Sequence, residues 1–159
     1  MTTKTIDLWL NHVLEIPNLW GSNGVSVTKS VKWDETKTTL IKAELLVTVS
    51  PNVGYVKSWI NLNGVSVQSF YWSIGDSGAK TDRTDIIGSL LNGSNIFNFI
   101  GAKEFANPAF VSFIITARLI LEFEGEAPNG GTDYTLMLEV AVAVAAFFLG
   151  LSVIGGMKK

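Results

Sequence analysis

The feature that most constrains this chain is an uncharged apolar stretch near the C-terminus, residues 140–157, which reads VAVAVAAFFLGLSVIGGM. As an α-helix it would be about 27 Å long, and with the flanking residues from Tyr134 it would exceed the roughly 30 Å hydrocarbon core of a bilayer. Glu139 lies near one end and two lysines, residues 158–159, lie at the other, where charged side chains can reach the interface. We therefore predict one transmembrane helix over residues 134–157, followed by a basic tail.

The same stretch allows a second interpretation, because residues 140–144 alternate Val and Ala, and alternation is typical of a β-strand. The apolar run is longer than a usual strand and alanine favours helix, so the helix is the prediction and a buried final strand is the alternative. Small residues would recur four positions apart on the helix, where another helix can approach closely, although small residues are also simply common in such helices. These candidate packing positions are Ala141, Ala145, Ala146, Gly150, Ser152 and Gly156.

Charge bears on how such a chain would sit in a membrane. Only 16% of the residues are charged, against roughly 25% in an ordinary soluble domain. No basic residue lies between Arg118 and Lys158, so the positive-inside tendency places the C-terminus on the enclosed side and the N-terminal domain outside that compartment. The N-terminal segment shows no pattern of a secretory signal. A virus particle assembled around an internal membrane would reconcile these two observations, and a cell surface is the alternative location.

Residues 1–126 carry the pattern of an antiparallel β-sandwich. Residues 56–62 and 65–72 are strand-like runs that flank Asn63-Gly64, and an Asn-Gly dipeptide in that position is the strongest short-range signal for a β-hairpin. Other alternating runs separated by turn residues occur along the chain, and 11% of the residues are aromatic and able to fill a core. We predict a mainly β protein, an antiparallel jelly-roll β-sandwich at residues 1–126, joined by a linker at residues 127–133 to the C-terminal helix.

Part of this region resembles the galactose-binding-domain-like jelly rolls. In such domains a strand ends in an Asn-Gly turn, a short helical turn starts at an Asp and carries paired leucines, and a Gly-x-Asn leads into the next strand. The sequences NLNGVSV at residues 61–67 and TDIIGSLLNGSNIFNFIG at residues 84–101 match this order. The resemblance carries over no sugar-binding residues. It implies that Asp85 caps the turn, that Leu90 and Leu91 close one end of the sandwich, and that Gly93 and Asn95 start the following strand.

The sequence offers little that could carry catalysis. It contains no cysteine, and its single histidine, His12, lies in an apolar stretch without a Gly-x-Ser-x-Gly nucleophile motif elsewhere. We therefore expect no catalytic residues, no cofactor and no enzymatic activity. The net charge of −2 and the absence of a basic stripe disfavour nucleic acid as a partner.

Two kinds of ligand deserve consideration. The loop at residues 75–85 contains Asp76, Asp82 and Asp85, whose oxygens suit Ca²⁺, but Lys80 and Arg83 lie among them and turn or cap roles are the favoured alternative. Aromatic side chains that face solvent can stack on sugar rings. The candidate ligand-facing aromatics are Trp59, Tyr71 and Trp72.

Two functions from different classes remain. The first is a structural role, as a membrane-anchored jelly-roll subunit of a membrane-containing virus particle, with an archaeal virus capsid or envelope as the favoured case. Its partners would be the lipid bilayer and either further copies of the chain or other virion proteins. The second is a membrane-tethered carbohydrate-binding or adhesion module on a cell surface, with a glycan as partner.

Overall fold

The structure is a computed structural model that describes residues 1–17, 23–33, 39–104, 110–124 and 138–142. Within these ranges the chain forms nine β-strands and a single turn of 3₁₀ helix. They are β1 (Thr2–Ile16), β2 (Gly24–Trp33), β3 (Thr39–Pro51), β4 (Val56–Leu62), β5 (Val65–Trp72), β6 (Lys80–Asp85), η1 (Ile87–Ser89), β7 (Gly93–Lys103), β8 (Val111–Glu124) and β9 (Leu138–Val142).

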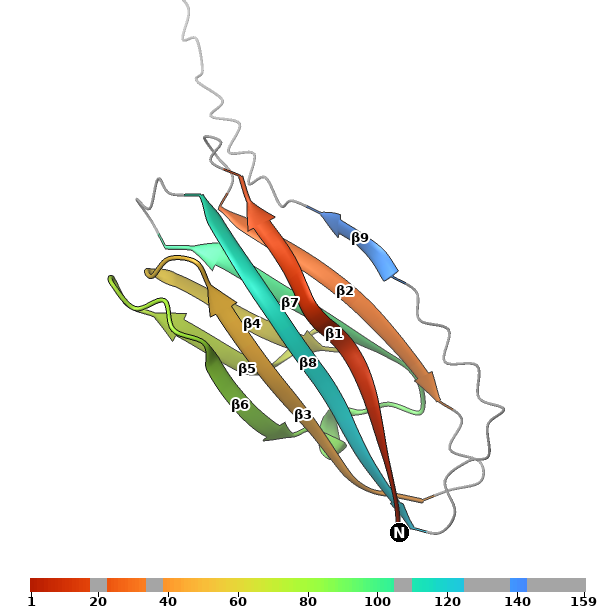
Figure 1. Cartoon of the computed structure of the whole chain (residues 1–159). Helices are drawn as coiled ribbons and strands as arrows, with labels where there is room; N and C mark the ends of the chain where they lie inside the picture. Colours follow the sequence, from red (N-terminus) through yellow and green to blue (C-terminus); the bar gives the residue numbers. More distant parts are fainter. Residues whose placement is uncertain (18–22, 34–38, 105–109, 125–137, 143–159) are drawn as a thin grey trace, which may run out of the picture.

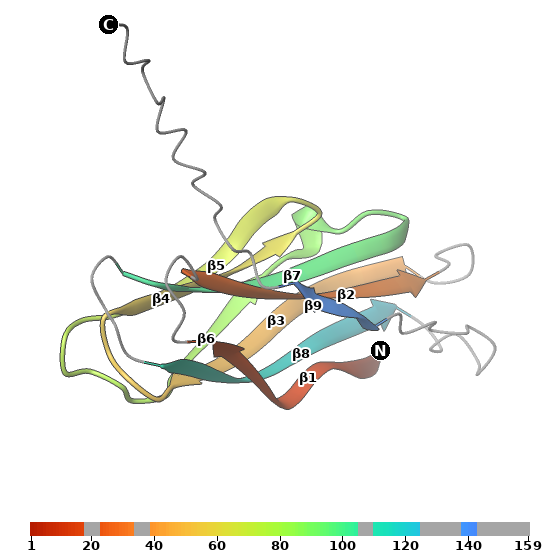
Figure 2. The same cartoon turned by 90° about the horizontal axis from the view of Figure 1, so that it is seen from above.

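The strands form two antiparallel sheets packed face to face, with orders β1-β8-β3-β6 and β5-β4-β7-β2-β9. Figures 1 and 2 show these two layers from perpendicular directions. From β1 to β8 the chain crosses between the sheets in the order of an eight-stranded jelly roll, in which each pair of neighbouring strands is antiparallel. The predicted antiparallel jelly-roll β-sandwich is therefore confirmed.

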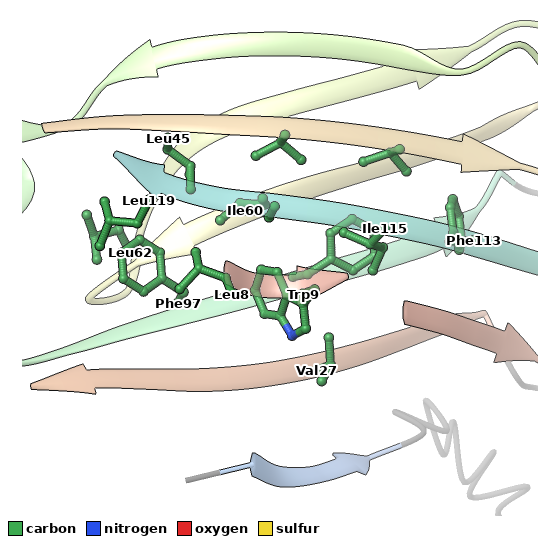
Figure 3. Packing of buried hydrophobic residues seen from close by; sticks show 14 of the residues in the cluster. Leu8, Trp9, Val27, Leu45, Ile60, Leu62, Phe97, Phe113, Ile115 and Leu119 are labelled. Carbon is green, nitrogen blue, oxygen red and sulfur yellow. The ribbon is translucent and has the colours of Figure 1, made fainter. Parts of the chain in front are cut away.

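The alternation of side chains along each strand builds the core. On β3 the inward positions are Ala43, Leu45 and Val47, all fully buried, and the residues between them lie on the outer face. Phe99 of β7 meets Phe113 of β8 edge to face, with ring centroids 5.9 Å apart, so the aromatic side chains join the two sheets. Figure 3 shows these apolar side chains filling the space between the layers.

Strand β1 departs from strict alternation of inward and outward side chains, and as a result two consecutive side chains are buried in the core. Its pairing with β8 shifts register between Asp7 and Trp9 and again between Trp9 and His12. The first bulge lets Leu8 and Trp9, which are neighbours in sequence, both lie in the core. At the second bulge Asn11 has a φ of 47°, and its backbone N–H donates to the hydroxyl of Thr116 at 3.2 Å.

A buried lysine joins the two sheets at the first bulge of β1. Lys29 lies on the inward face of β2, and its Nζ donates to the backbone carbonyl of Asp7 at 3.1 Å and to that of Leu8. Burial lowers the pKa of the Lys29 amine, and the nearby Asp7 carboxylate partly opposes that shift. The ammonium thus donates hydrogen bonds to two carbonyl groups of β1 at the point where the register of β1 with β8 shifts, and it gives these buried acceptors a partner.

Five residues of the predicted transmembrane helix are described, and they form a strand. β9 pairs antiparallel with β2 through Ser26↔Val142, Thr28↔Glu139 and Lys29↔Leu138, and Figure 1 shows it beside β2 at the edge of the sheet. These five residues form a strand and not the predicted helix, and residues 140–142 among them belong to the Val-Ala alternation on which the strand alternative was based. The other residues of the predicted helix lie outside the described ranges, and no helix within the described ranges is long and apolar enough to span a bilayer.

Replacing Lys29 by Met should lower the free energy of unfolding by about 1–3 kcal/mol, because the apolar stem is kept while the carbonyls of Asp7 and Leu8 lose their donor. Urea unfolding followed by tryptophan fluorescence measures the change. The matched control is Lys32→Met on the same strand, whose exposed side chain predicts a change within about 0.5 kcal/mol. Equal effects of the two substitutions would contradict the role assigned to Lys29.

Candidate functional site

The outer face of the β4–β5 hairpin presents the two candidate aromatics that reach solvent. The hairpin forms as predicted, with Asn63 at φ 52° and Gly64 at φ 85° in its tight turn. Alternation along β4 buries Val56, Ser58, Ile60 and Leu62 and leaves Trp59 partly exposed on the outer face. On β5 the side chain of Tyr71 is 51% exposed. Trp59 and Tyr71 therefore belong to the same solvent-facing surface.

These aromatics line a shallow depression that is open to solvent. Its lining residues are Lys57, Ser58, Trp59, Ser66, Ser69, Phe70 and Tyr71. The pairing of β4 with β5 sets Lys57 opposite Tyr71 and Trp59 opposite Ser69. The ammonium of Lys57 is held by the carboxylate of Glu104, with Nζ 3.0 Å from Oε1. Ser58 and Phe70 of this lining are buried, so the exposed part of the depression combines Trp59 and Tyr71 with the hydroxyls of Ser66 and Ser69 and one paired cation. No carboxylate is among the lining residues.

The same face continues across β7 and β2 with polar side chains that the sequence analysis did not select. Asn61 of β4 lies opposite Asn98 of β7, which in turn lies opposite Thr28 of β2. The Oδ1 atom of Asn98 is buried and has no hydrogen-bond partner among the described residues. The signal for these positions was present in the alternation of residues 56–62, which puts Asn61 on the same face as Trp59.

Trp72, the third candidate aromatic, does not face a ligand. Its side chain is fully buried, it stacks on Phe70 with ring centroids 6.0 Å apart, and its Nε1 donates to the carbonyl of Gly78 at 2.7 Å. Lys80 lies over the ring, with Nζ 5.3 Å from the centroid. The prediction for Trp72 is therefore wrong, because position 72 lies on the inward face of β5, whereas Tyr71 lies on the outward one.

The three aspartates proposed as Ca²⁺ ligands are not brought together. Asp76 pairs with Lys80 at 3.0 Å and accepts from the N–H of Gly78, contacts that lower the pKa of its carboxyl. Asp82 lies opposite the inward Val47, and Asp85 lies opposite the outward Glu44, so these two point to opposite faces of β6. Among the described residues no three His, Asp or Glu side chains could hold a metal ion. Asp76 and Asp85 each accept from the N–H two residues further along the chain, a turn role, whereas Asp82 lies within β6.

An amide cluster fixes the hairpin against the start of β7. Buried Asn95 accepts from the N–H of Leu91 at 2.7 Å and donates to its carbonyl at 2.7 Å, and its Oδ1 also accepts from Nδ2 of Asn63 at 3.0 Å. Asn63 in turn accepts from the N–H of Ile96 at 2.9 Å. The cluster therefore ties the turn at the end of the candidate face to the neighbouring strand.

The residues on which the resemblance to galactose-binding-domain-like jelly rolls was based agree with it in part. The carboxylate of Asp85 accepts from the N–H of Ile87 at 3.0 Å, a turn contact just before η1, but the N-cap of η1 is Ile86 and Asp85 does not cap it. Gly93 opens β7 with a φ of 95°. Leu90 packs against the core, but Leu91 is 55% exposed and does not close the sandwich.

The remaining candidates are His12 and the small residues proposed for helix packing. His12 lies on β1 opposite Ile115, in the other sheet. Of the small residues proposed for helix packing, Ala141 belongs to β9, and Ala145, Ala146, Gly150, Ser152 and Gly156 lie outside the described residues.

Comparison with known proteins gives distant structural likenesses only. No family model matches the sequence, and no curated protein matches it. One similar solved structure is the CBM36-1 domain of a multidomain xylanase from the hindgut metagenome of Trinervitermes trinervoides, with 13% identity and a TM-score of 0.40 over 80% of this chain and 99% of that one. Another is a carbohydrate-binding module CBM36 in complex with calcium and xylotriose, with 11% identity and a TM-score of 0.36 over 76% and 99%. Likenesses this distant carry no argument about function.

Replacing Asn95 by Ala should lower the free energy of unfolding by about 1–2 kcal/mol, because part-buried groups of Leu91 and Asn63 lose their partners. Urea unfolding measures this loss, and the exposed Ser94→Ala substitution on the same strand is the control, expected to change the value by less than about 0.5 kcal/mol. A neutral Asn95→Ala variant would show that the amide cluster does not stabilise the hairpin.

Proposed function

We propose that this chain is a non-catalytic carbohydrate-binding module whose glycan contacts the outer face of β4, β5 and β7. One observation supports it above all: Trp59 and Tyr71 share a solvent-facing surface, where they line a shallow depression with Ser66 and Ser69. Aromatic rings that combine an apolar face with a polar edge suit the mixed surface of a sugar, whose C–H groups stack on the ring while its hydroxyls seek hydrogen bonds.

The shape and chemistry of the depression fit binding without catalysis. Enzyme pockets for small molecules enclose most of their ligand, whereas this depression is open and would contact only one side of a glycan. Glycoside hydrolysis requires two carboxyl groups flanking the scissile bond, and the lining residues include none. The hydroxyls of Ser66 and Ser69 and the paired ammonium of Lys57 would supply polar contacts. Because these groups lie on paired strands, binding needs little ordering of the protein.

The proposed setting is a surface outside a membrane-enclosed compartment. There the C-terminal apolar stretch would tether the chain to lipid, and the sandwich would meet glycans of a host or of a neighbouring cell. A cell surface and the outside of a virus particle both meet this requirement.

Glycan binding is tested with the full-length chain in nanodiscs applied to a glycan array, followed by calorimetry on the best ligand. Tyr71→Ala should weaken binding about tenfold, because a stacked ring contributes about 1–1.5 kcal/mol. Phe110→Ala is the matched control, since Phe110 is also an exposed aromatic, at 43%, but lies outside this face. Phe110→Ala should leave the affinity unchanged.

Two results would overturn the glycan proposal. One is an array on which no glycan is retained. The other is an equal loss of affinity in the Tyr71 and Phe110 variants, with both proteins unchanged in thermal unfolding, because it would place the ligand elsewhere.

A second candidate function is a structural subunit of a membrane-containing virus particle. The strand orders β1-β8-β3-β6 and β5-β4-β7-β2 support it, because this eight-stranded arrangement is used by viral capsid proteins as well as by lectin domains. We rank this function second because it is supported by the fold alone, and one fold can serve many functions. Electron microscopy of the full chain in lipid vesicles separates the candidates: a regular surface lattice favours the structural subunit, and dispersed single copies that retain glycan favour the binding module.

A further inference from the structure

The C-terminal apolar stretch and strand β9 share residues. Residues 140–157 form an uncharged run long enough to cross a bilayer as a helix. Residues 140–142 of that run belong to β9, where the backbone pairs with β2 at the edge of the five-stranded sheet. One segment of sequence therefore has two competing uses.

The two uses exclude each other because of length. Without β9, residues 143–157 would make a helix of about 23 Å, shorter than the roughly 30 Å hydrocarbon core. The two lysines that follow oppose any extension of the span toward the C-terminus. A complete span must therefore recruit residues on the N-terminal side, and those residues are the ones in β9.

The two uses also exclude each other because of backbone hydrogen bonding. Among the strands that the structure describes, β9 pairs with β2 alone, so its other edge needs water or another strand. An open sheet edge does not occur in hydrocarbon, where a spanning segment must satisfy its own N–H and C=O groups as a helix does. Entry into the bilayer therefore requires β9 to leave β2.

The pairing of β9 is limited in a way that suits release. It joins three residue pairs with a shift in register between Ser26 and Thr28, whereas β7 pairs with β2 along the whole strand from Gly24 to Trp33. Loss of β9 thus leaves the sandwich of β1 to β8, with its two sheets, intact.

We propose that the outer edge of β2 is a docking surface for residues 138–142 of the same chain, and that a lipid bilayer competes for this segment. In water the segment is a strand on β2. In a membrane it joins the transmembrane helix, and the edge of β2 opens over residues 26–29. The proposal concerns lipid and the β2 edge, so it stands or falls independently of glycan binding at Tyr71.

The test uses cysteine cross-linking in the full chain, which has no native cysteine. The reporter pair is Thr28→Cys with Glu139→Cys, at positions that face each other across β2 and β9. The matched control is Thr28→Cys with Asn98→Cys, which shares the β2 position but reports on β7. Both proteins are made by cell-free synthesis with and without phosphatidylcholine vesicles and treated with a short bis-maleimide.

We expect an intrachain reporter cross-link without vesicles, at least a fivefold loss of it in the vesicle-bound fraction, and a control cross-link that is equal in both. Absence of the reporter cross-link in water would overturn the docking of residues 138–142 on β2. A cross-link between two chains would show that the segment on β2 comes from another copy of the chain and would overturn the same-chain assignment. Persistence of the cross-link in the vesicle-bound protein, or failure of the chain to bind vesicles, would overturn the competition with lipid.

A lengthened variant tests the reason for the competition. Insertion of five leucines after Phe148 gives residues 143–157 enough length to span the bilayer without β9, about 30 Å. This variant should keep the reporter cross-link in vesicles at the level seen in water. Loss of the cross-link in the lengthened variant as well would show that span length does not release β9.

Discussion

A β-strand sends successive side chains to opposite faces, and this constraint decides both the core and the candidate binding face of this protein. On β4 and β5 it buries Val56, Ile60 and Phe70 between the sheets. The intervening positions then place the partly exposed Trp59 and the exposed Tyr71 on the outer face, diagonal to each other in the pairing of β4 with β5. A shift of one residue in the pairing of this hairpin would exchange the two sets, so the Asn63-Gly64 turn that fixes the register also fixes the proposed glycan face.

The two sheets are joined by polar contacts as well as by the apolar core. At the edge where β1 faces β2, the ammonium of Lys29 binds backbone carbonyls of β1. Toward the opposite edge, Gln68 of β5 donates to the carbonyl of Leu45 of β3 at 3.2 Å. Buried polar groups cost free energy unless they are paired, so each contact favours one alignment of the sheets over others. The rigid outer face depends on this alignment.

Features set by neighbouring residues could be predicted from the sequence, and features set by distant strands could not. The hairpin at Asn63-Gly64 and the turn contact of Asp85 with the N–H of Ile87 follow from local turn chemistry. Trp72 was misplaced because the aromatic run Phe70 to Trp72 gives no clue to which parity faces the core. The alternation of residues 25–33 puts Lys29 on the same mostly apolar face as Val27 and Val31. Its partners could not be predicted, because they lie on β1 at a bulge that places Leu8 and Trp9 together in the core.

The C-terminus shows why a hydropathy pattern does not fix one structure. Length and absence of charge favour a helix in lipid, while the Val-Ala alternation of residues 140–144 favours a strand, and the two properties coexist because small and β-branched apolar residues suit both. In water a helix of these residues would expose its apolar surface, whereas on β2 the backbone gains partners. The proposed competition with lipid reverses this preference, because an open strand edge is not tolerated in hydrocarbon. On that proposal, the solvent around residues 138–142, as well as their sequence, determines their secondary structure.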